Sequence, residues 1–303
     1  MDNLTHSLVG ALIGQAGLKR KTGLAMPALI IGANIPDIDA ACFLWLDGVE
    51  HLAFRRGITH GPIAWVLLPL LLAGGLWWFD RWQAKRGKRP EGRLPLHFGW
   101  LYGLSLLATL THPALDWLNV YGVRLLEPFS SRWFYGDVLF IIDVWLWALM
   151  GFATWFSLRR EKRGGEWMRP ARIAIAVALA YIGASAAVSY SVESEPVGGP
   201  TGSSTIIASP LPFVPFARDR ITGGDGLYAL DGTALPGVPL ANCNISQLAK
   251  NDEQLAAFLF WSRTPFIEPG EDGVYRMRDA RYYDPRARDR FTVALPDVRC
   301  EPE

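Results

Sequence analysis

Charged residues, cysteine and histidine are all scarce in this sequence of 303 residues. Charged side chains make up 19% of the chain and the net charge is +1, which excludes a disordered tail protein and a basic nucleic-acid binder. The three cysteines contain no Cys-x-x-Cys pair, so we expect no thiolate zinc site. Half of all residues are apolar, and the chemistry must therefore come from a few polar side chains on an apolar background.

The few charges are distributed unevenly along the chain. Residues 1–190 contain 19 Lys and Arg against 13 Asp and Glu, whereas residues 191–303 contain 11 against 16. All five histidines lie in the first part. Residues 191–204 are rich in Ser, Gly, Pro and Glu, a composition typical of linkers. We therefore predict a domain over 1–190, a linker over 191–204 and a second domain over 205–303.

Long apolar runs dominate the first part. A membrane-spanning helix needs roughly 20 apolar residues. A soluble protein with buried helices is the alternative, but these runs would leave most of each helix surface without a polar face. We predict an all-α polytopic membrane helix bundle of about six membrane helices, the first two short; four or five spans would change only those two. The runs cover residues 7–18, 23–36, 58–79, 96–112, 138–158 and 171–190.

Basic loops predict the orientation of this bundle. Lys19–Lys21 and the segments 80–95 and 159–172 are rich in Lys and Arg, and such short loops stay cytoplasmic. Both termini of the bundle, and everything after residue 190, then lie on the periplasmic or exterior side. Asp2 stands where a cleavable signal would carry basic residues, so we expect the first helix to be retained.

The second domain reads as soluble and β-rich or α+β. Short apolar stretches bounded by turn residues predict strands, and one helix is expected over 246–262, with Ser246 as its cap. Cys243 and Cys300 lie on the exported side, where a disulfide is permitted; two unpaired thiols are the alternative. The expected strands cover 204–207, 213–216, 273–277 and 291–294.

Ionisable residues gather at the ends of the predicted helices that face outward. Charged groups at a membrane are costly, so each is a candidate functional residue. We interpret His51 and His97 as structural, because His51 has no companion at ligand spacing and His97 lies beside a basic loop on the opposite face. The outward-facing set comprises His6, Asp37, Asp39, His60, His112, Asp116, Asp137 and Asp143.

The spacing within this set favours a metal site. His112 and Asp116 are four residues apart and so share one helix face, or one face of a new turn if Pro113 interrupts the helix. Asp37 and Asp39 can face one cation from an extended segment. Imidazole and carboxylate without thiolate favour Zn²⁺, with Mn²⁺ or Fe²⁺ as alternatives, over Ca²⁺. The predicted metal ligands are His6, Asp37, Asp39, His60, His112 and Asp116, enough for two ions with a bridging carboxylate.

Four segments resemble a known family. They are Asp2-Asn-Leu-Thr-His6, Asn34-Ile-Pro-Asp37-Ile-Asp39, Arg56-Gly-Ile-Thr-His60-Gly and Thr111-His-Pro-x-Leu-Asp116-Trp-x-Asn119-x-Tyr-Gly. They resemble the YdjM-like family of bacterial inner-membrane metal-dependent hydrolases, whose founding member is LexA-regulated. The resemblance implies a hydrolase in the bacterial inner membrane and leaves the substrate open.

The order of these residues also resembles, more distantly, the zinc-dependent phospholipase C and single-strand nuclease superfamily. That resemblance implies that Asp116 bridges two metals, that His60 and His112 hold one of them and that His6 holds the other. It also implies that Asp37 or Asp39 is a ligand or the base. No histidine follows His112, so a third histidine-bound metal is not expected.

Together these features predict a metal-dependent hydrolase, in particular a phosphoesterase that acts on a lipid or other amphiphilic substrate at the outer face. Asp37 or Asp39 would orient the attacking water, and Asp143 or Asn119 would support the ligands from behind. The alternative is a non-enzymatic metal-binding membrane protein or a transporter. Transport would call for ionisable groups near the bilayer middle and paired repeats, and the sequence has neither.

Overall fold

The protein consists of two compact units in a computed structural model that describes residues 1–194, 205–283 and 291–301. The first, which we call the helical unit, comprises residues 1–39, 56–186 and 212–215. The second, the mixed unit, comprises residues 40–55, 187–211 and 216–303. Residues 40–55 lie early in the sequence and nevertheless belong to the mixed unit.

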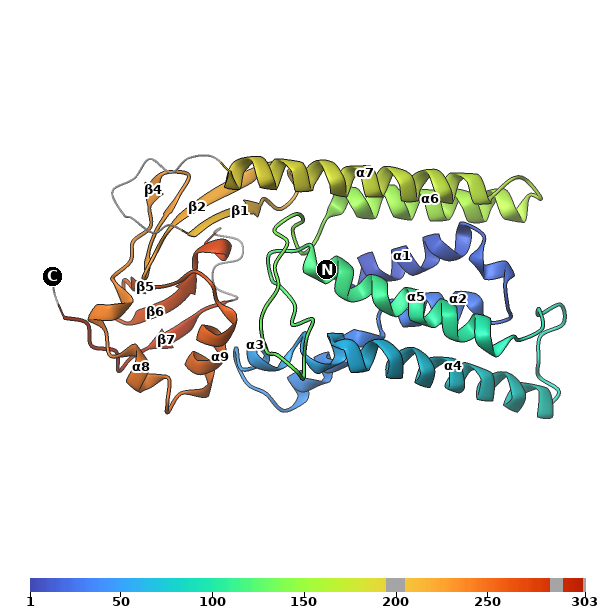
Figure 1. Ribbon diagram of the computed structural model, residues 1–303, viewed down its shortest axis with the longest axis horizontal. Coiled ribbons are helices and arrows are strands. Elements are labelled where there is room, and N and C mark those ends of the chain that lie inside the picture. The colour runs from blue at the N-terminus through green and yellow to red at the C-terminus, as the bar shows by residue number, and fades with distance from the viewer. Residues whose placement is uncertain (195–204, 284–290, 302–303) are drawn as a thin grey trace. The chain divides into compact units, whose positions relative to one another are not determined.

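The helical unit is built from α-helices joined by 3-10 segments and by loops (Figure 1). Three of the helices begin at clear sequence signals. Asp2 caps α1 by accepting hydrogen bonds from the backbone of Leu4 and Thr5, Asp143 caps α6 in the same way, and Pro62 opens α4. The helices are α1 (Asn3–Gln15), α2 (Ala25–Gly32), α4 (Pro62–Lys85), α5 (Phe98–Trp117), α6 (Val144–Lys162) and α7 (Met168–Glu193), with η1 (Leu18–Arg20), η2 (Ile35–Leu44) and η3 (Ile58–His60) between them.

The expectation of about six membrane helices is confirmed only in part. Among the described residues, α4 and α7 are long and apolar enough to cross a membrane. The pair α2 and η2, bent by 51°, would make a third span if it acts as one. At 1.5 Å per residue, α1 is about 20 Å long, less than the roughly 30 Å of a bilayer core. Helices α5 and α6 do not meet the same criterion.

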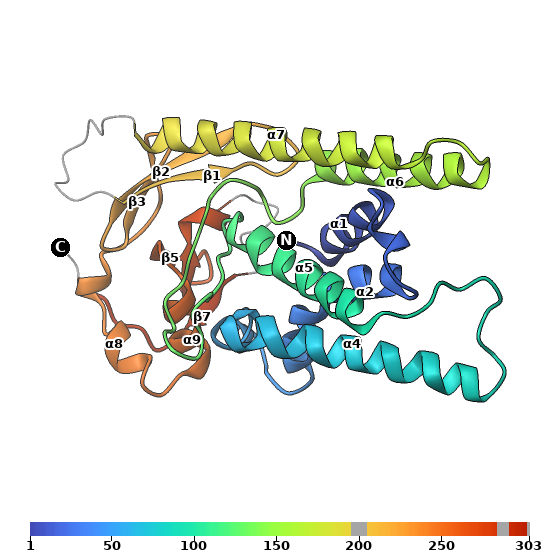
Figure 2. The same cartoon turned by 45° about the vertical axis from the view of Figure 1, so that its right-hand side comes forward.

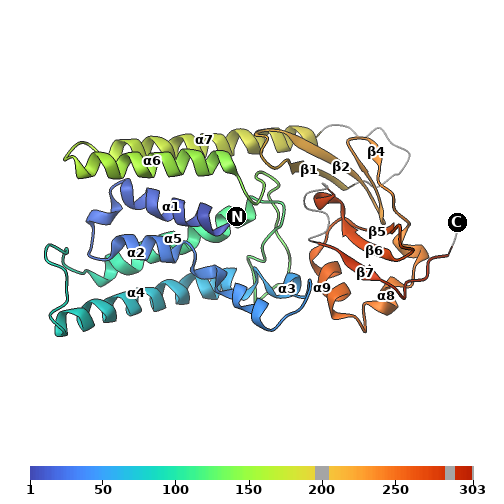
Figure 3. The same ribbon diagram turned by 180° about the vertical axis from the view of Figure 1, so that it is seen from behind.

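Close packing of the helices creates the frame for the polar residues. Helix α1 packs against α2 and α6, and α5 packs against α2 and α4. A Cβ on Gly10 would stand 2.5 Å from the Leu29 carbonyl oxygen, so glycine is what permits the close approach of α1 and α2. Helices α6 and α7 run side by side in all three views (Figures 1, 2 and 3) and share an apolar cluster that includes Leu146, Met150 and Ala174.

The mixed unit contains two antiparallel sheets, as expected for a β-rich or α+β fold. Its core includes Ile207, Ile221, Tyr228 and Phe266. Helix α3 (His51–Phe54) packs against α9 within this unit. One sheet has the order β1 (Thr205–Pro210), β2 (Arg218–Gly224), β3 (Leu227–Leu230), β4 (Thr233–Ala234); the other has β5 (Pro265–Pro269), β6 (Tyr275–Asp279), β7 (Val293–Leu295); the helices are α8 (Ile245–Leu248) and α9 (Glu253–Trp261), with η4 (Leu240–Asn242) and η5 (Ala280–Tyr282).

Three local expectations for this part differ from the structure. The single helix over 246–262 is two helices, because the chain turns between α8 and α9 and Asp252, not Ser246, caps the longer one. Residues 213–216 lie between strands β1 and β2 and are not a strand. Helix α7 continues to Glu193, into the predicted linker, and the remainder of that linker, 195–204, lies outside the described residues.

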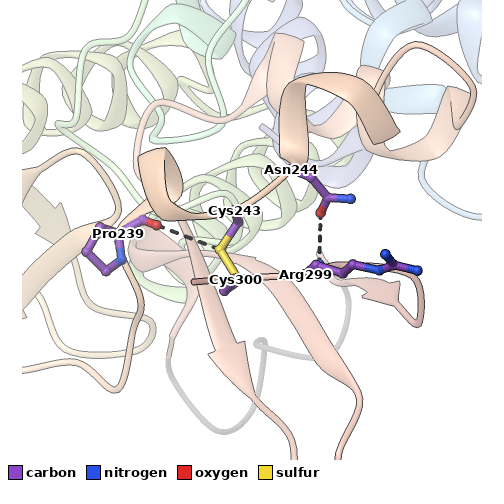
Figure 4. Close-up of a disulfide and its surroundings, with 5 residues drawn as sticks. All are labelled: Pro239, Cys243, Asn244, Arg299 and Cys300. Carbon is purple, nitrogen blue, oxygen red and sulfur yellow. Dashed lines mark hydrogen bonds between the residues drawn. A yellow bond between two sulfur atoms is a disulfide. The ribbon is translucent and has the colours of Figure 1, made fainter. Parts of the chain in front are cut away.

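A disulfide and a buried ion pair tie the mixed unit together. Cys243 and Cys300 are bonded across 57 residues of sequence, and beside them Asn244 and Arg299 exchange two hydrogen bonds (Figure 4). Burial alone would raise the pKa of the Asp279 carboxyl group. The Arg281 guanidinium and the Ser262 and Thr264 hydroxyls outweigh burial and hold that pKa below its ordinary value.

Candidate metal centre

Four buried side chains of the helical unit converge on one point. Asp37 comes from η2, His60 from η3, and His112 and Asp116 from α5, and one ligand atom from each lies within 4.8 Å of the others. Helix α5 continues through Pro113, so His112 and Asp116 share a face of one unbroken helix. The two Nε2 atoms of His60 and His112 lie 3.4 and 3.6 Å from Asp116 Oδ2, and 4.0 and 3.7 Å from Asp37 Oδ1.

Each of these two histidines directs Nε2 toward the carboxylates because another group holds its Nδ1. The Nδ1 of His112 lies 2.6 Å from the Ala33 carbonyl oxygen, which only accepts, so Nδ1 carries the proton and Nε2 a lone pair. The Thr59 hydroxyl donates to Asp39 Oδ2 and lies 3.0 Å from Nδ1 of His60, so its oxygen can accept from that nitrogen. Both imidazoles therefore present an Nε2 lone pair to the same point.

Several atoms at this point make no hydrogen bond within the part of the chain that the structure describes. They include Nε2 of His60, Nε2 of His112 and Oδ2 of Asp116, and all three side chains are fully buried. Asp116 Oδ2 has an ion pair with Arg56, whereas the two imidazole nitrogens are buried without a donor. Buried polar atoms that lack hydrogen bonds are costly, and a bound ion is one of the few arrangements that accounts for two such nitrogens beside a carboxylate.

The distances are wider than those around a bound tetrahedral metal. Ligand atoms at about 2.05 Å from a tetrahedral Zn²⁺ are about 3.3 Å from one another. The nitrogen-to-oxygen distances here are 3.4 to 4.0 Å, and the four ligand atoms lie within 4.8 Å of one another, so the side chains would have to move closer together to hold one ion. Two imidazole nitrogens and two carboxylate oxygens suit Zn²⁺, Mn²⁺ or Fe²⁺. Asp37, His60, His112 and Asp116 can therefore hold a divalent metal.

Asp116 also faces a second group of polar atoms through its other oxygen. The Nε2 atom of His6 lies 3.4 Å from Asp116 Oδ1, and the Met1 amino group contacts the same oxygen. The His6 ring stacks on His112 with 3.7 Å between centroids, and neither of its nitrogens makes a hydrogen bond among the described residues. Asp116 thus stands between two sets of nitrogen atoms, the arrangement that a bridging carboxylate requires.

The structure assigns different positions to the other predicted residues. Asp39 does not belong to the group of four; it lies behind His60, 3.6 Å from Nδ1, and accepts a hydrogen bond of 2.7 Å from the Arg56 backbone. Asp143 is not brought into the group either. Its carboxylate caps α6 and accepts a hydrogen bond from the Tyr181 hydroxyl. Because the cap is Asp143, α6 begins at Val144, later than the predicted run from 138. Asp137, the remaining outward-facing candidate, is buried in the loop before that cap and is not part of the group of four.

Arg56 is the residue of this site to which sequence reasoning gave no role. Its side chain is buried, its Nε lies 3.1 Å from Asp116 Oδ2, and its guanidinium donates to Asn119 Oδ1 and to the Gly122 carbonyl. Its backbone has a positive φ of 54°, a strained conformation that is uncommon outside glycine and clusters at functional sites. The sequence did contain a signal for this role. Arg56 begins the segment that ends in His60, and two buried carboxylates require a positive charge nearby.

The residue after His60 explains why this segment keeps its shape. A Cβ on Gly61 would stand 1.9 Å from the carbonyl oxygen of Glu127, so no larger residue fits there without movement of the backbone. Pro62 follows at the first position of α4 and fixes the start of that helix. His60 is thereby held at the end of α4 where the other ligands lie.

The fold and the site together define a class: a helical protein with candidate membrane spans and a buried Asp–His group fit for a divalent metal. Within that class, the chain belongs to the YdjM inner membrane protein family, which matches residues 1–192. This match covers every residue of the candidate metal centre and all of the helical unit except residues 212–215.

A second comparison gives a more distant relative. The chain is 29% identical over 167 residues to a protein of Bacillus subtilis (strain 168) named uncharacterized protein YfhP. The match covers 52% of this chain and 47% of YfhP, so the chain spans about half the length of that curated relative. No solved structure matches the chain. The comparisons establish the family, and the family together with the candidate spans fits a membrane protein.

Proposed function

We propose that this protein is a metal-dependent hydrolase, in particular a phosphoesterase that acts on a lipid or other amphiphilic substrate at the outer face of the inner membrane. The observation that carries the proposal is the convergence of two imidazole Nε2 atoms and a carboxylate oxygen, all buried and without hydrogen bonds among the described residues. A purely structural cluster would satisfy those atoms internally.

In this proposal His60, His112, Asp116 and Asp37 hold the metal, and Asp39 positions His60 through Thr59. The metal would lower the pKa of a bound water and polarise the phosphoryl oxygen. Asp37 is 8% exposed whereas the other three are fully buried, so we assign it the orientation of the attacking water. The choice of Asp37 over Asp39 also follows from the hydrogen bonds that already occupy Asp39.

Arg56 supplies the positive charge that a phosphoester needs. Its guanidinium lies at Asp116 and is held in a fixed orientation by Asn119 and the Gly122 carbonyl. A planar guanidinium suits the recognition of phosphate oxygens. This cation favours a phosphoester over a neutral ester as the substrate class.

The outer-face location rests on the charge pattern and on the disulfide. Arg and Lys residues cluster just before α7, which predicts that this end is cytoplasmic and that the chain after Glu193 is extracytoplasmic. The Cys243–Cys300 disulfide lies in that later part, and disulfides persist in oxidising compartments. A multi-pass protein with an extracytoplasmic mixed unit accounts for both observations.

Metal analysis and hydrolysis assays test the proposal on the full chain purified in detergent. We expect zinc or manganese to co-purify, and the protein to release phosphate or a phosphorylated headgroup from phosphatidic acid or phosphatidylglycerol in mixed micelles. His112→Ala and Asp116→Asn should lose both metal and activity, whereas His97→Ala, at the opposite end of α5, should lose neither. Metal uptake into vesicles without hydrolysis of any phosphoester would favour the transporter alternative and contradict the proposal.

A further inference from the structure

An apolar cavity of about 380 Å³ lies in the helical unit between α1, α5, α6 and α7. Its volume falls within the roughly 300–1,000 Å³ typical of small-molecule sites. Apart from two threonines and Trp117, every lining side chain is aliphatic or methionine. The hydroxyl of Thr5 donates to Asp2 and that of Thr111 to the Ala108 carbonyl, so neither offers a proton to a ligand. The cavity therefore suits an apolar occupant.

The cavity adjoins the candidate metal centre through the backbone of two helices. Thr5 and Thr111 line it and directly precede His6 and His112, and Leu115 lines it and directly precedes Asp116. Adjacent Cα atoms are about 3.8 Å apart. A molecule in the cavity thus lies one residue away from the metal-binding side chains.

The surroundings of the cavity determine what fills it. Helix α7, which forms one wall, is a candidate membrane span, and its residues Ile173 and Val177 are exposed on the protein surface that a bilayer would cover. A water molecule in this cavity would lose hydrogen bonds, because the lining offers it no polar partners. A hydrocarbon chain recovers the van der Waals contacts that an empty cavity forfeits.

We propose that this cavity binds one long hydrocarbon chain of the amphiphilic phosphoester while its phosphate reaches the metal centre. The inference rests on the proposed function and adds to it the class of substrate: a phosphoester with a single long chain available for insertion. Lipid tails are as apolar as leucine, so moving the chain from bilayer to cavity contributes little affinity. The cavity acts instead by orienting the phosphate relative to the metal and Arg56.

Filling the cavity tests this inference. Ala178 of α7 is buried and lines the cavity, whereas Ala180 of the same helix is exposed and does not. Ala178→Phe should lower the ratio of dioleoyl phosphatidic acid hydrolysis to bis(p-nitrophenyl) phosphate hydrolysis on the order of 100-fold, the effect of a small misplacement of the reacting groups. Ala180→Phe should leave the ratio unchanged. An unchanged ratio in Ala178→Phe would overturn the inference.

A binding measurement separates this inference from the proposed function. A phosphatidic acid with a diazirine in its acyl chain, presented in phosphatidylcholine nanodiscs, should label Val9 and Ile182, which line the cavity. Labelling should disappear in Ala178→Phe and persist in His112→Ala. Labelling without any hydrolysis would contradict the proposed function and leave the cavity assignment standing. Labelling that is spread over the exposed faces of α7, or unchanged in Ala178→Phe, would overturn the assignment.

Discussion

Metal binding should stabilise the helical unit, because the ion satisfies buried atoms that otherwise lack hydrogen bonds. The perturbation is the addition of Zn²⁺ to protein stripped with a chelator. A ligand that binds only the folded state at 100 times its Kd stabilises that state by about 2.7 kcal/mol. For a unit of this size, about 1 kcal/mol shifts Tm by about 2–4 °C, so the expected rise is about 5–10 °C.

Thermal unfolding followed by circular dichroism at 222 nm measures this shift. The long α-helices α4, α5, α6 and most of α7 belong to the helical unit, so the loss of helical signal reports the unfolding of that unit. The zinc-dependent rise should be absent in the variant His60→Ala combined with His112→Ala, and retained in His97→Ala. An equal rise in the double variant would place zinc elsewhere, and no rise in the native sequence would refute the reasoning from unsatisfied atoms.

Four further outcomes follow from individual contacts. Asp39→Asn should lower zinc affinity about 10–100-fold, measured against a fluorescent chelator, because it removes the group that orients Thr59 and His60. Arg56→Gln should lower the stability of the metal-free protein by about 3–5 kcal/mol, because it leaves the buried Asp116 carboxylate without its guanidinium partner; thermal unfolding measures this loss. Cys300→Ser should cost about 4 kcal/mol in urea unfolding, from the 57-residue loop that the disulfide closes. The lowered pKa of Asp279 stabilises the mixed unit. This stabilisation is complete above the ordinary pKa of 3.8 and is lost as the pH falls through the pKa of the folded state. Acid unfolding followed by tryptophan fluorescence measures the loss.

Each of these outcomes has a matched control. Asp47→Asn, at an exposed carboxylate, should leave zinc affinity unchanged. A loss of zinc affinity equal to that of Asp39→Asn would contradict the role of Asp39 in orienting Thr59 and His60. Arg55→Gln removes the neighbouring guanidinium, and a comparable destabilisation there would contradict the role given to Arg56. Cys42→Ser keeps the disulfide intact, so a reductant should still make this variant more sensitive to urea, as it does the native sequence. In Asp279→Asn the acid dependence should flatten; a profile identical to that of the native sequence would contradict the assignment.

The four residues of the candidate group were all among the predicted ligands, because chemistry and topology restricted the choice together. His60, His112 and Asp116 stood out as ionisable residues at outward-facing helix ends, and the four-residue spacing of the last two implied one helix face. Arg56 did not stand out, because an arginine in a loop is ordinarily solvated. Its role depends on tertiary contacts with Asp116, Asn119 and Gly122, which lie more than 55 residues away and leave no local pattern.

Element boundaries were less predictable than element existence. Hydropathy adds up composition over a window and does not detect a cap, so the run from residue 138 gave no sign that Asp143 would begin α6 at Val144. The same limit merged α8 and α9, which Asp252 separates by capping the second helix. The number of spans is also less predictable from hydropathy than the presence of helices. The first predicted run, 7–18, overlaps α1 (Asn3–Gln15), whose 13 residues are shorter than a bilayer core, and α4 and α7 are the helices long and apolar enough to cross a membrane among the described residues.

The position of the candidate metal centre along the chain has a consequence for biosynthesis. Every side chain that forms it lies at or before Asn119, whereas α6 and α7, which complete the walls of the apolar cavity, are made afterwards. At about 5–20 residues per second, a ribosome needs roughly 4–15 s to proceed from Asn119 to the end of α7 at Glu193. The ligands are thus available to bind a metal during translation, before α6 and α7 complete the cavity. The metal can therefore bind before the hydrocarbon chain does.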